Sequence, residues 1–269
     1  MKLLSICKSK LNTKLSFSLK DGNIIESVFY RGNTLCISTQ VGCGVGCIFC
    51  ASGKEKLIRN LTFKEIVSQY EIANSILGPI KNIAMAGIGE PLHNWENVKK
   101  AFHNFKDTGL KVSFYTSGFP LNRLNELIEL KHNGVTISLH AVDDFKRKRI
   151  MKFTGNIAEL INFLRNKLSY MSKRKRKKIS LGYILLKGIN DSEKDISKLA
   201  DISKYLGIGI TLLYYNPVNE YIKPVSEEEY EKIFLLLKKS GIRVTLSNRF
   251  RKDPIGGCGT LRVAKIYSN

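Results

Sequence analysis

Three cysteines occupy one short run of the chain, Cys43-Gly-Val-Gly-Cys47-Ile-Phe-Cys50. A structural zinc site normally has four ligands, but no second cysteine pair is present and the first histidine of the chain is His93. Three thiolates can instead bind three irons of a cubane cluster and leave the fourth iron open. Reductive cleavage of S-adenosylmethionine (SAM) requires such an iron, which binds the amino and carboxylate groups of SAM. The motif therefore predicts a [4Fe-4S] cluster on Cys43, Cys47 and Cys50, with SAM as a second cofactor.

The alternative interpretation of this run is three unrelated buried cysteines, which are common in protein cores. Gly42, Gly44 and Gly46 alternate with the first two cysteines. Glycines allow a loop to wrap closely around an inorganic core, so they favour the cluster.

The elements around this loop indicate an α/β fold. Residues 13–39 are typical of a small β layer, and Thr62 with Glu65 forms a capping box that predicts a helix through about residue 77. Strand and helix patterns then alternate. The expected strands are 82–88, 111–117, 134–140, 178–186, 208–215 and 243–248, and the expected helices are 94–107, 120–131, 156–171, 191–205 and 225–239.

This alternation predicts a parallel sheet closed only in part, a partial (β/α)6 open barrel, because six units are too few for an eight-fold barrel. We expect a small N-terminal β extension over 1–33 and a core over 34–269 that ends in a cysteine loop. Chemistry in such sheets lies at the carboxyl ends of the strands.

Polar residues occur at several of those strand ends. Gly89 and Glu90 follow one strand, and the Glu90 carboxylate could accept hydrogen bonds from the amine of SAM. Ser138 and His140 end another strand, and Asn216 follows a third. Each could also be an ordinary loop residue, and His140 could equally be a hydrogen-bonded core histidine.

Three further cysteines lie outside the motif. Cys258 is flanked by glycines and Cys36 precedes the motif by seven residues. Exposed thiols of this kind suggest nucleophilic or redox work, although Cys36 alone is typical of a core cysteine. Cys7 has no role that the sequence indicates.

Composition favours a polyanionic partner. Lys and Arg total 44 against 23 Asp and Glu, a net charge of +21, which suits nucleic acid; lineage-wide lysine enrichment is the alternative. Six consecutive cations at 173–178 suit a phosphate backbone or form a solvated, disordered loop. No apolar run approaches the length of a membrane span, no signal peptide is evident, and six cysteines in so long a chain do not form a disulfide scaffold. We therefore expect a cytoplasmic protein.

Several motifs together resemble one family. They are TLCISTQVGCGVGCIFCASG (34–53), RNLTFKEIVSQ (59–69), GIGEPLHNWENV (87–98), ISLHAVDD (137–144), GINDS (188–192), YNPV (215–218) and GGCGTL (256–261). Their order is similar to that in the radical SAM RNA methyltransferases called RlmN and Cfr, and the resemblance runs from about Glu26 to Leu261. The segment from Gln40 to Cys43 is closer to the RlmN branch.

The resemblance implies a two-stage methylation. Cys258 would take a methyl group from one SAM, and a 5′-deoxyadenosyl radical from a second SAM would abstract hydrogen from it. The methylene radical would add to adenine, Glu26 would remove the ring proton, and a disulfide between Cys36 and Cys258 would release the product. The SAM contacts that the family implies are Gly89, Glu90, Ser138, Leu139, His140 and Asn216.

The expected product is 2-methyladenosine in 23S rRNA, tRNA or both. An external one-electron reductant such as flavodoxin or ferredoxin, a monomeric state and no membrane association are also expected. Two departures from the family pattern are Tyr115, at the position of a SAM-contacting serine, and the apparent lack of the helical accessory domain that precedes the core. Three alternatives stay open: methylation at adenine C8 as in Cfr, a radical SAM enzyme with a non-RNA substrate, and a non-catalytic iron–sulfur protein that binds RNA.

Overall fold

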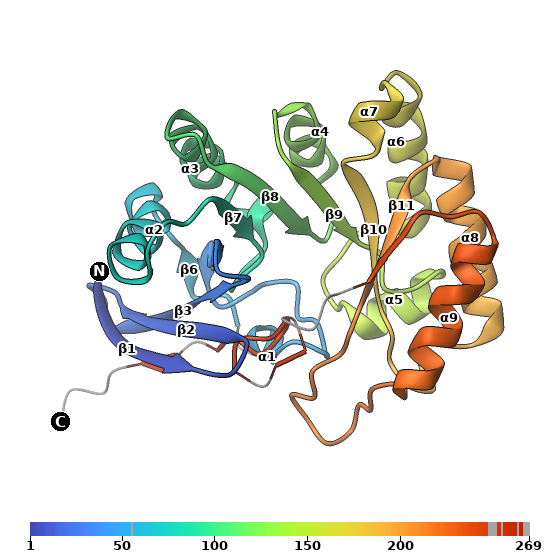
Figure 1. The fold of residues 1–269 in the computed structure, drawn as a ribbon. Coiled ribbons are helices and arrows are strands. Elements are labelled where there is room, and N and C mark those ends of the chain that lie inside the picture. Colours follow the sequence, from blue (N-terminus) through green and yellow to red (C-terminus); the bar gives the residue numbers. More distant parts are fainter. Residues whose placement is uncertain (55, 247–251, 254, 263, 266–269) are drawn as a thin grey trace.

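The computed structural model describes residues 1–269 except 55, 247–251, 254, 263 and 266–269 (Figure 1). The strands are β1 (Lys2–Lys8), β2 (Asn12–Ser18), β3 (Asn23–Tyr30), β4 (Thr34–Ile37), β5 (Gln40–Val41), β6 (Arg59–Asn60), β7 (Asn82–Met85), β8 (Lys111–Thr116), β9 (Gly134–Ser138), β10 (Ile179–Ile184), β11 (Gly209–Leu213), β12 (Val244–Leu246) and β13 (Ala264–Lys265). The helices are α1 (Ala51–Lys54), α2 (Phe63–Leu77), α3 (Trp95–Asp107), α4 (Leu121–Glu129), α5 (Asp144–Ile150), α6 (Ile157–Ser169), α7 (Lys173–Arg176), α8 (Glu193–Leu206) and α9 (Glu227–Lys239), with a 3₁₀ turn, η1, at Pro91–Asn94.

One curved sheet of eleven strands organises the molecule, in the order β1-β2-β3-β4-β7-β8-β9-β10-β11-β12 with β13 paired to β3. From β4 to β12 all neighbours are parallel, whereas β1 to β4 are antiparallel. The parallel part confirms the predicted α/β architecture, and its strands present their carboxyl ends at one edge. The predicted division at residue 33 falls in the turn between β3 and β4, whose strands share the sheet; two separate domains stay a prediction.

The long helices lie on the outer side of this curved sheet (Figure 1). Local sequence explains where these helices begin and end. Thr62 and Glu65 form the predicted capping box at the start of α2, and Gly207, in the left-handed region at φ 64°, ends α8.

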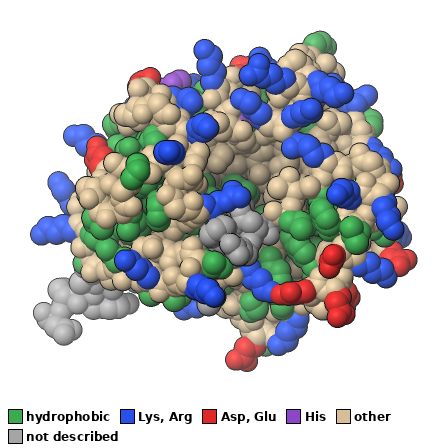
Figure 2. Space-filling model, viewed as in Figure 1, with side chains coloured by type: hydrophobic (Ala, Val, Ile, Leu, Met, Phe, Trp, Pro, Cys, Tyr) green, Lys and Arg blue, Asp and Glu red, His purple; other side chains and the backbone are tan. Residues whose placement is uncertain are grey.

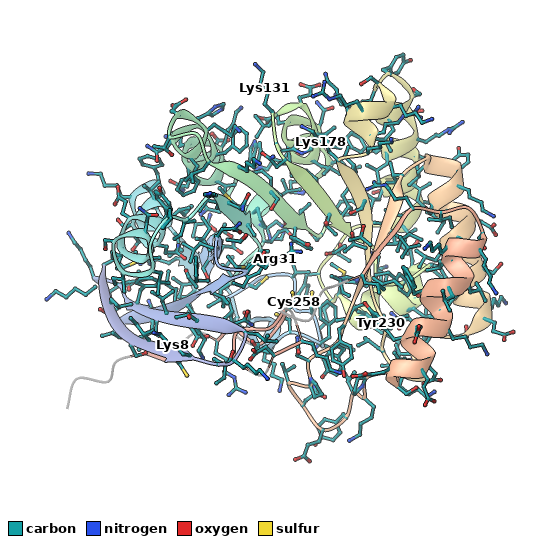
Figure 3. The ribbon with its side chains drawn as sticks, viewed as in Figure 1. Lys8, Arg31, Lys131, Lys178, Tyr230 and Cys258 are labelled. Carbon is teal, nitrogen blue, oxygen red and sulfur yellow. The ribbon has the colours of Figure 1, made fainter. Side chains whose placement is uncertain are left out.

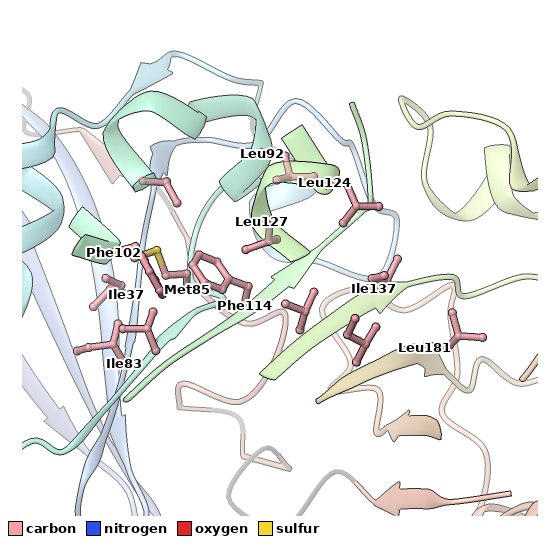
Figure 4. Packing of buried hydrophobic residues seen from close by; sticks show 14 of the residues in the cluster. Ile37, Ile83, Met85, Leu92, Phe102, Phe114, Leu124, Leu127, Ile137 and Leu181 are labelled. Carbon is pink, nitrogen blue, oxygen red and sulfur yellow. The ribbon is translucent and has the colours of Figure 1, made fainter. Parts of the chain in front are cut away.

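Beneath the helices, side chains from four neighbouring strands form a continuous apolar layer (Figure 4). Ile83, Phe114, Ile137 and Leu181 are each at most 1% exposed. Strands buried on both faces are typical of parallel sheets and explain the near-continuous apolar runs of the sequence.

Several elements were not predicted, among them β1, α5 and α7. The strand β1 is mostly exposed and so has no clear alternation, α5 lies in a segment rich in cations between β9 and α6, and the basic tract contains a helical turn, α7, capped by Ser172 rather than an irregular loop. The predicted strand 243–248 is β12 over Val244–Leu246; Arg243 lies just before the strand, and residues 247 and 248 lie outside the described residues.

The basic tract lies at the amino ends of the strands. Lys178, immediately before β10, and Lys131 appear at the upper edge of the molecule, away from the more central Cys258 (Figure 3). Cationic side chains are dense over that edge, around α4, α6 and α7, whereas acidic side chains gather over α9 (Figure 2). Among the described residues, no helix is both long and apolar enough to cross a membrane.

Candidate active site

The carboxyl ends of the parallel strands surround a cavity that collects most of the cysteines. Five of them line it: Cys36, Cys43, Cys47, Cys50 and Cys258. Cys7 is exposed on β1, where it pairs with Lys14, and takes no part. None of the six cysteines is in a disulfide in this structure.

Backbone geometry explains two of the three glycines in the cysteine loop. Gly42 has φ +79°, and a Cβ there would lie 2.1 Å from the carbonyl oxygen of Lys56. Gly46 has φ +68° and packs against the ring of Phe153. Gly44 has neither constraint, since its nearest neighbours would lie 3.8 Å from an added Cβ. The loop therefore needs glycine at both positions where it changes direction.

Two distant segments fix the loop. Residues 150–153 run antiparallel to it: Cys47 bridges Met151, Ile48 N–H donates to the Ile150 carbonyl at 3.0 Å, and Phe153 N–H donates to the Val45 carbonyl at 3.0 Å.

From the other side, the segment that carries Cys258 contacts α1. Ala51 N–H donates to the Gly259 carbonyl at 2.7 Å, and the Ser52 hydroxyl donates to the Leu261 carbonyl at 2.7 Å. Residues 150–153 on one side and the Cys258 segment on the other thus hold the cysteine loop in place.

The three loop thiols suit a cationic cluster. Desolvation raises the pKa of Cys43 to about 12 and raises the pKa of Cys47 and Cys50 above its ordinary value. Repulsion between neighbouring thiolates adds to the shift at Cys43 and Cys47. Buried thiolates need positive charge beside them, and iron supplies it when ligation displaces the protons.

No group of His, Cys, Asp or Glu in the described part of the chain is arranged to hold a single metal ion. A cubane cluster does not require the three thiolates to converge on one ion, because each thiolate binds a separate iron. The donor set and the glycine turns therefore fit the cluster rather than a mononuclear site.

Glu90 lies buried at the N-cap of η1, in the segment that follows β7, and its carboxylate is held by backbone and hydroxyl donors. Its Oε2 accepts the Ser117 N–H at 2.6 Å, and its Oε1 accepts the Leu92 N–H at 3.1 Å and the Thr116 hydroxyl. Desolvation raises the pKa of Glu90, and these hydrogen bonds oppose the shift. Gly89 and Glu90 both line the cavity, so a ligand amine there would meet an oriented carboxylate.

His140 combines the two roles that its position allowed. It lines the cavity, yet its Nδ1 accepts the Ile184 N–H at 3.1 Å and its ring meets Phe49 edge-on. Burial and the nearby Arg147 charge lower the pKa of His140 to about 3, so the ring is neutral. Ser138 also lines the cavity, whereas the Leu139 side chain is fully buried in the main core. Tyr115 faces the same cavity.

Asn216 lies behind Cys258 rather than on the cavity wall. Its Nδ2 donates to the Cys258 carbonyl at 2.9 Å, and its Oδ1 accepts the Asp253 N–H at 3.1 Å. It lines a neighbouring pocket with Lys14 and Arg262. The structure thus does not bring Asn216 together with the other predicted SAM contacts. Through these two hydrogen bonds, Asn216 instead holds the loop that presents Cys258.

Glu26 lies on β3, two and four residues before Val28 and Tyr30, which line the cavity. Side chains two apart on a strand share a face, so Glu26 faces the same side at the edge of the site. Its carboxylate pairs with the Lys14 ammonium at 2.7 Å and accepts the Arg262 N–H at 2.9 Å.

Sequence reasoning missed two buried residues that assemble the site. Gln40 accepts the Glu90 N–H at 2.8 Å through its side-chain oxygen. The Arg147 guanidinium donates to the carbonyls of Ser117, Ser138 and Gly155 at 2.9, 3.1 and 2.9 Å. Gln40 lies inside the motif at 34–53, shortly before its three cysteines, which could have drawn attention to it. Nothing in the cationic run around Arg147 distinguishes Arg147 from its exposed neighbours.

Residues 37–200 match the model of the Radical SAM superfamily. The chain is 37% identical over 280 residues to a "Probable dual-specificity RNA methyltransferase RlmN" of Clostridium botulinum, covering 97% of this chain and 78% of that protein. A protein of the same name from Thermotoga petrophila is 35% identical, over 100% and 81% of the two chains. A crystal structure titled as a radical SAM methyltransferase from Sphaerobacter thermophilus superimposes with a TM-score of 0.85 at 28% identity, covering 97% of this chain and 81% of that one.

Proposed function

Since this chain belongs to the radical SAM superfamily and, within it, to the RlmN family, we propose that it methylates RNA at adenine C2 through a methyl group carried on Cys258. Family membership confirms the predicted fold and the two predicted cofactors, a [4Fe-4S] cluster and SAM. The proposed substrates are 23S rRNA, tRNA or both. The observation that carries the proposal is that Cys36 and Cys258 line the same cavity as the three cysteines of the motif.

In this proposal Cys43, Cys47 and Cys50 hold the cluster, which when bound delivers one electron to SAM and so supplies the radical chemistry. Gly89, Glu90, Ser138 and His140 line the space where SAM would bind, and Glu90 would accept hydrogen bonds from its amine. Leu139 would contribute only its backbone.

Two thiols outside the cluster perform the transfer. The Cys258 thiolate would take the methyl group of one SAM. A hydrogen atom of that methyl group would pass to the 5′-deoxyadenosyl group of a second SAM, and the carbon would bond to adenine C2 while still attached to the Cys258 sulfur. Loss of one electron, and of the C2 proton to Glu26, would restore the aromatic ring. The Cys36 thiolate would then attack this sulfur, forming a disulfide and breaking the carbon–sulfur bond, and the released carbon would take a proton to become the methyl group of the base. Restoring both thiols takes two electrons and two protons from an external reductant. A flavodoxin or ferredoxin is the proposed electron donor to the cluster.

Glu26 is the proposed base for the ring proton. Its position on the cavity side of β3 supports this role, and the Lys14 ion pair supplies a cation that can stabilise the carboxylate between turnovers.

Nucleoside mass spectrometry tests the proposal. The chain would be expressed in a host deleted for its own enzyme of this family, and rRNA and tRNA would be digested separately. We expect 2-methyladenosine in at least one pool, none with Cys258→Ala, and the wild-type amount with Cys7→Ala, which changes an exposed thiol away from the cavity. Finding 8-methyladenosine would move the reaction to C8, and finding neither product with an intact cluster would refute RNA adenosine as the substrate.

A further inference from the structure

A shallow groove lies immediately outside the cofactor cavity. Met151 lines the inner cavity, and the next two residues, Lys152 and Phe153, line the outer groove. His93, Phe119 and Arg123 complete its walls. One short segment of chain therefore separates the place where chemistry would occur from a second, open site that the proposed reaction leaves unused.

Phe153 is the most conspicuous residue of this groove because its side chain is 70% exposed. Its position is nevertheless fixed. The backbone N–H donates to the Val45 carbonyl at 3.0 Å, between Cys43 and Cys47, and the ring lies 3.3 Å from where a Cβ would stand on Gly46. An exposed phenyl ring is thus held directly on the cysteine loop.

Unpaired cations accompany the ring. Lys148, Arg149 and Lys152 are exposed and form no ion pair with any described residue. By contrast, Lys146 of the same helix pairs with Asp195 at 2.6 Å, and Arg147 is buried.

A second exposed ring lies on α5, the helix that directly precedes this segment. Phe145 is 72% exposed, and the Arg149 guanidinium lies 5.6 Å from the centre of its ring. Aromatic rings interleaved with cations are the surface that single-stranded nucleic acids bind, since bases stack on the rings and phosphates meet the cations.

We propose that this groove binds the nucleotide adjacent to the target adenosine, with its base stacked on Phe153 and its phosphate beside Lys152, and that Phe145 and Arg149 extend the track to a further nucleotide. This inference rests on the proposed function and adds how the RNA is aligned. The backbone of Phe153 is hydrogen-bonded to the cysteine loop. A base stacked on its ring would therefore be held at a fixed position relative to the reaction centre.

An acidic electron-donor protein is the other partner that exposed cations near a cluster could attract. The groove favours RNA over such a partner. Among the rings on its walls, Phe153 is mostly exposed, whereas the rings of His93 and Phe119 are half-buried. One exposed ring suits a single planar base rather than a broad protein interface.

The test compares cluster-loaded variants in RNA binding and in SAM cleavage. Fluorescence anisotropy with a labelled single-stranded adenosine-containing oligoribonucleotide and with total tRNA as competitor would report affinity. Phe153→Ala should weaken binding about 10- to 100-fold, the range expected for loss of one base stack. Lys152→Ala should lower the slope of log affinity against log salt by about 0.7. Iron content and dithionite-driven SAM cleavage should stay at the wild-type level.

Tyr170→Ala is the matched control, because this ring is 92% exposed but follows α6 at the amino ends of the strands. It should leave RNA affinity unchanged. Wild-type affinity in Phe153→Ala would overturn the proposal. If Phe153→Ala loses iron, the test passes to Lys152→Ala and Phe145→Ala. Wild-type RNA affinity and salt slope in both of these variants would then overturn the proposal.

A further arm separates the two partners. If the variants retain RNA affinity but lose only the SAM cleavage driven by flavodoxin, the surface belongs to the reductant and the proposal is overturned. Groove-dependent RNA binding without any methyladenosine in the wild type would instead refute the proposed function and support the RNA-binding groove.

Discussion

Replacing Asn216 by alanine separates two roles for this residue, a SAM contact and a clamp on the Cys258 loop. Its amide makes one hydrogen bond to the Cys258 carbonyl and accepts one from Asp253 N–H. At about 1 kcal/mol for each bond, the closed loop loses about 2 kcal/mol, a factor of about 30 in its population relative to open forms. We therefore expect methylation of Cys258 to slow by up to about 30-fold, with little change in SAM affinity.

Intact-protein mass spectrometry would follow methyl transfer to Cys258 in cluster-loaded protein, and equilibrium dialysis would give the SAM dissociation constant. Asn162→Ala is a suitable control, since Asn162 is exposed on α6 and its side chain makes no hydrogen bond with the described residues. A large loss of SAM affinity with unchanged methylation of Cys258 would refute the clamp and restore the role that the family resemblance implied.

Four other changes have defined outcomes. Cys258→Ala should still cleave SAM but carry no protein-bound methyl group by mass spectrometry; a methylated variant would identify another carrier. Cys36→Ala should accumulate a covalent protein–RNA adduct on denaturing gels, whereas free methylated RNA at the normal rate would exclude Cys36. Arg147→Met removes the donor from three carbonyls and should lower the free energy of unfolding in urea by about 3 kcal/mol; a change below about 1 kcal/mol would contradict this. Burial lowers the pKa of His132 to about 4, so the unfolded chain takes up a proton first as pH falls below about 6.5, and stability is lost from there to about pH 4. Between pH 7 and pH 5, His132→Gln should lose about 2 kcal/mol less than wild type in urea titrations, and equal losses would refute the shift.

The fold could be predicted from the sequence where local signals and burial agree. Strands such as β7 and β11 are apolar along most of their length, and the capping box of α2 lies where the sequence places it. β1 carries no such signal because most of its residues are exposed, so its strand pairing rests on backbone hydrogen bonds to β2 that no side-chain pattern reveals. The helix α5 was not predicted for a related reason, because a run of cations in the sequence is equally typical of a loop and of an exposed helix face.

The predicted residues of the site differ in how far local sequence could place them. The three motif cysteines and Glu90 lie in the segments that follow β4 and β7, two neighbouring parallel strands, so topology brings these segments to one edge of the sheet. Asn216 also follows a strand, but its orientation depends on Cys258 and Asp253, about 40 residues away, where no local pattern indicates a contact. Arg147 is the opposite case: its role follows from three carbonyls at strand and loop ends that exist only after the chain has folded.

The segment over residues 256–262 connects the start of the chain to its end. It meets α1 through Gly259 and Leu261, its Arg262 N–H donates to Glu26 on β3, and β13 then pairs with β3. These contacts span more than 200 residues of sequence, so during synthesis they form after the strands that make the rest of the wall. The cavity thus remains open on one side until residues 256–262 have left the ribosome, which leaves the cysteine loop accessible for cluster delivery before the last wall closes over it.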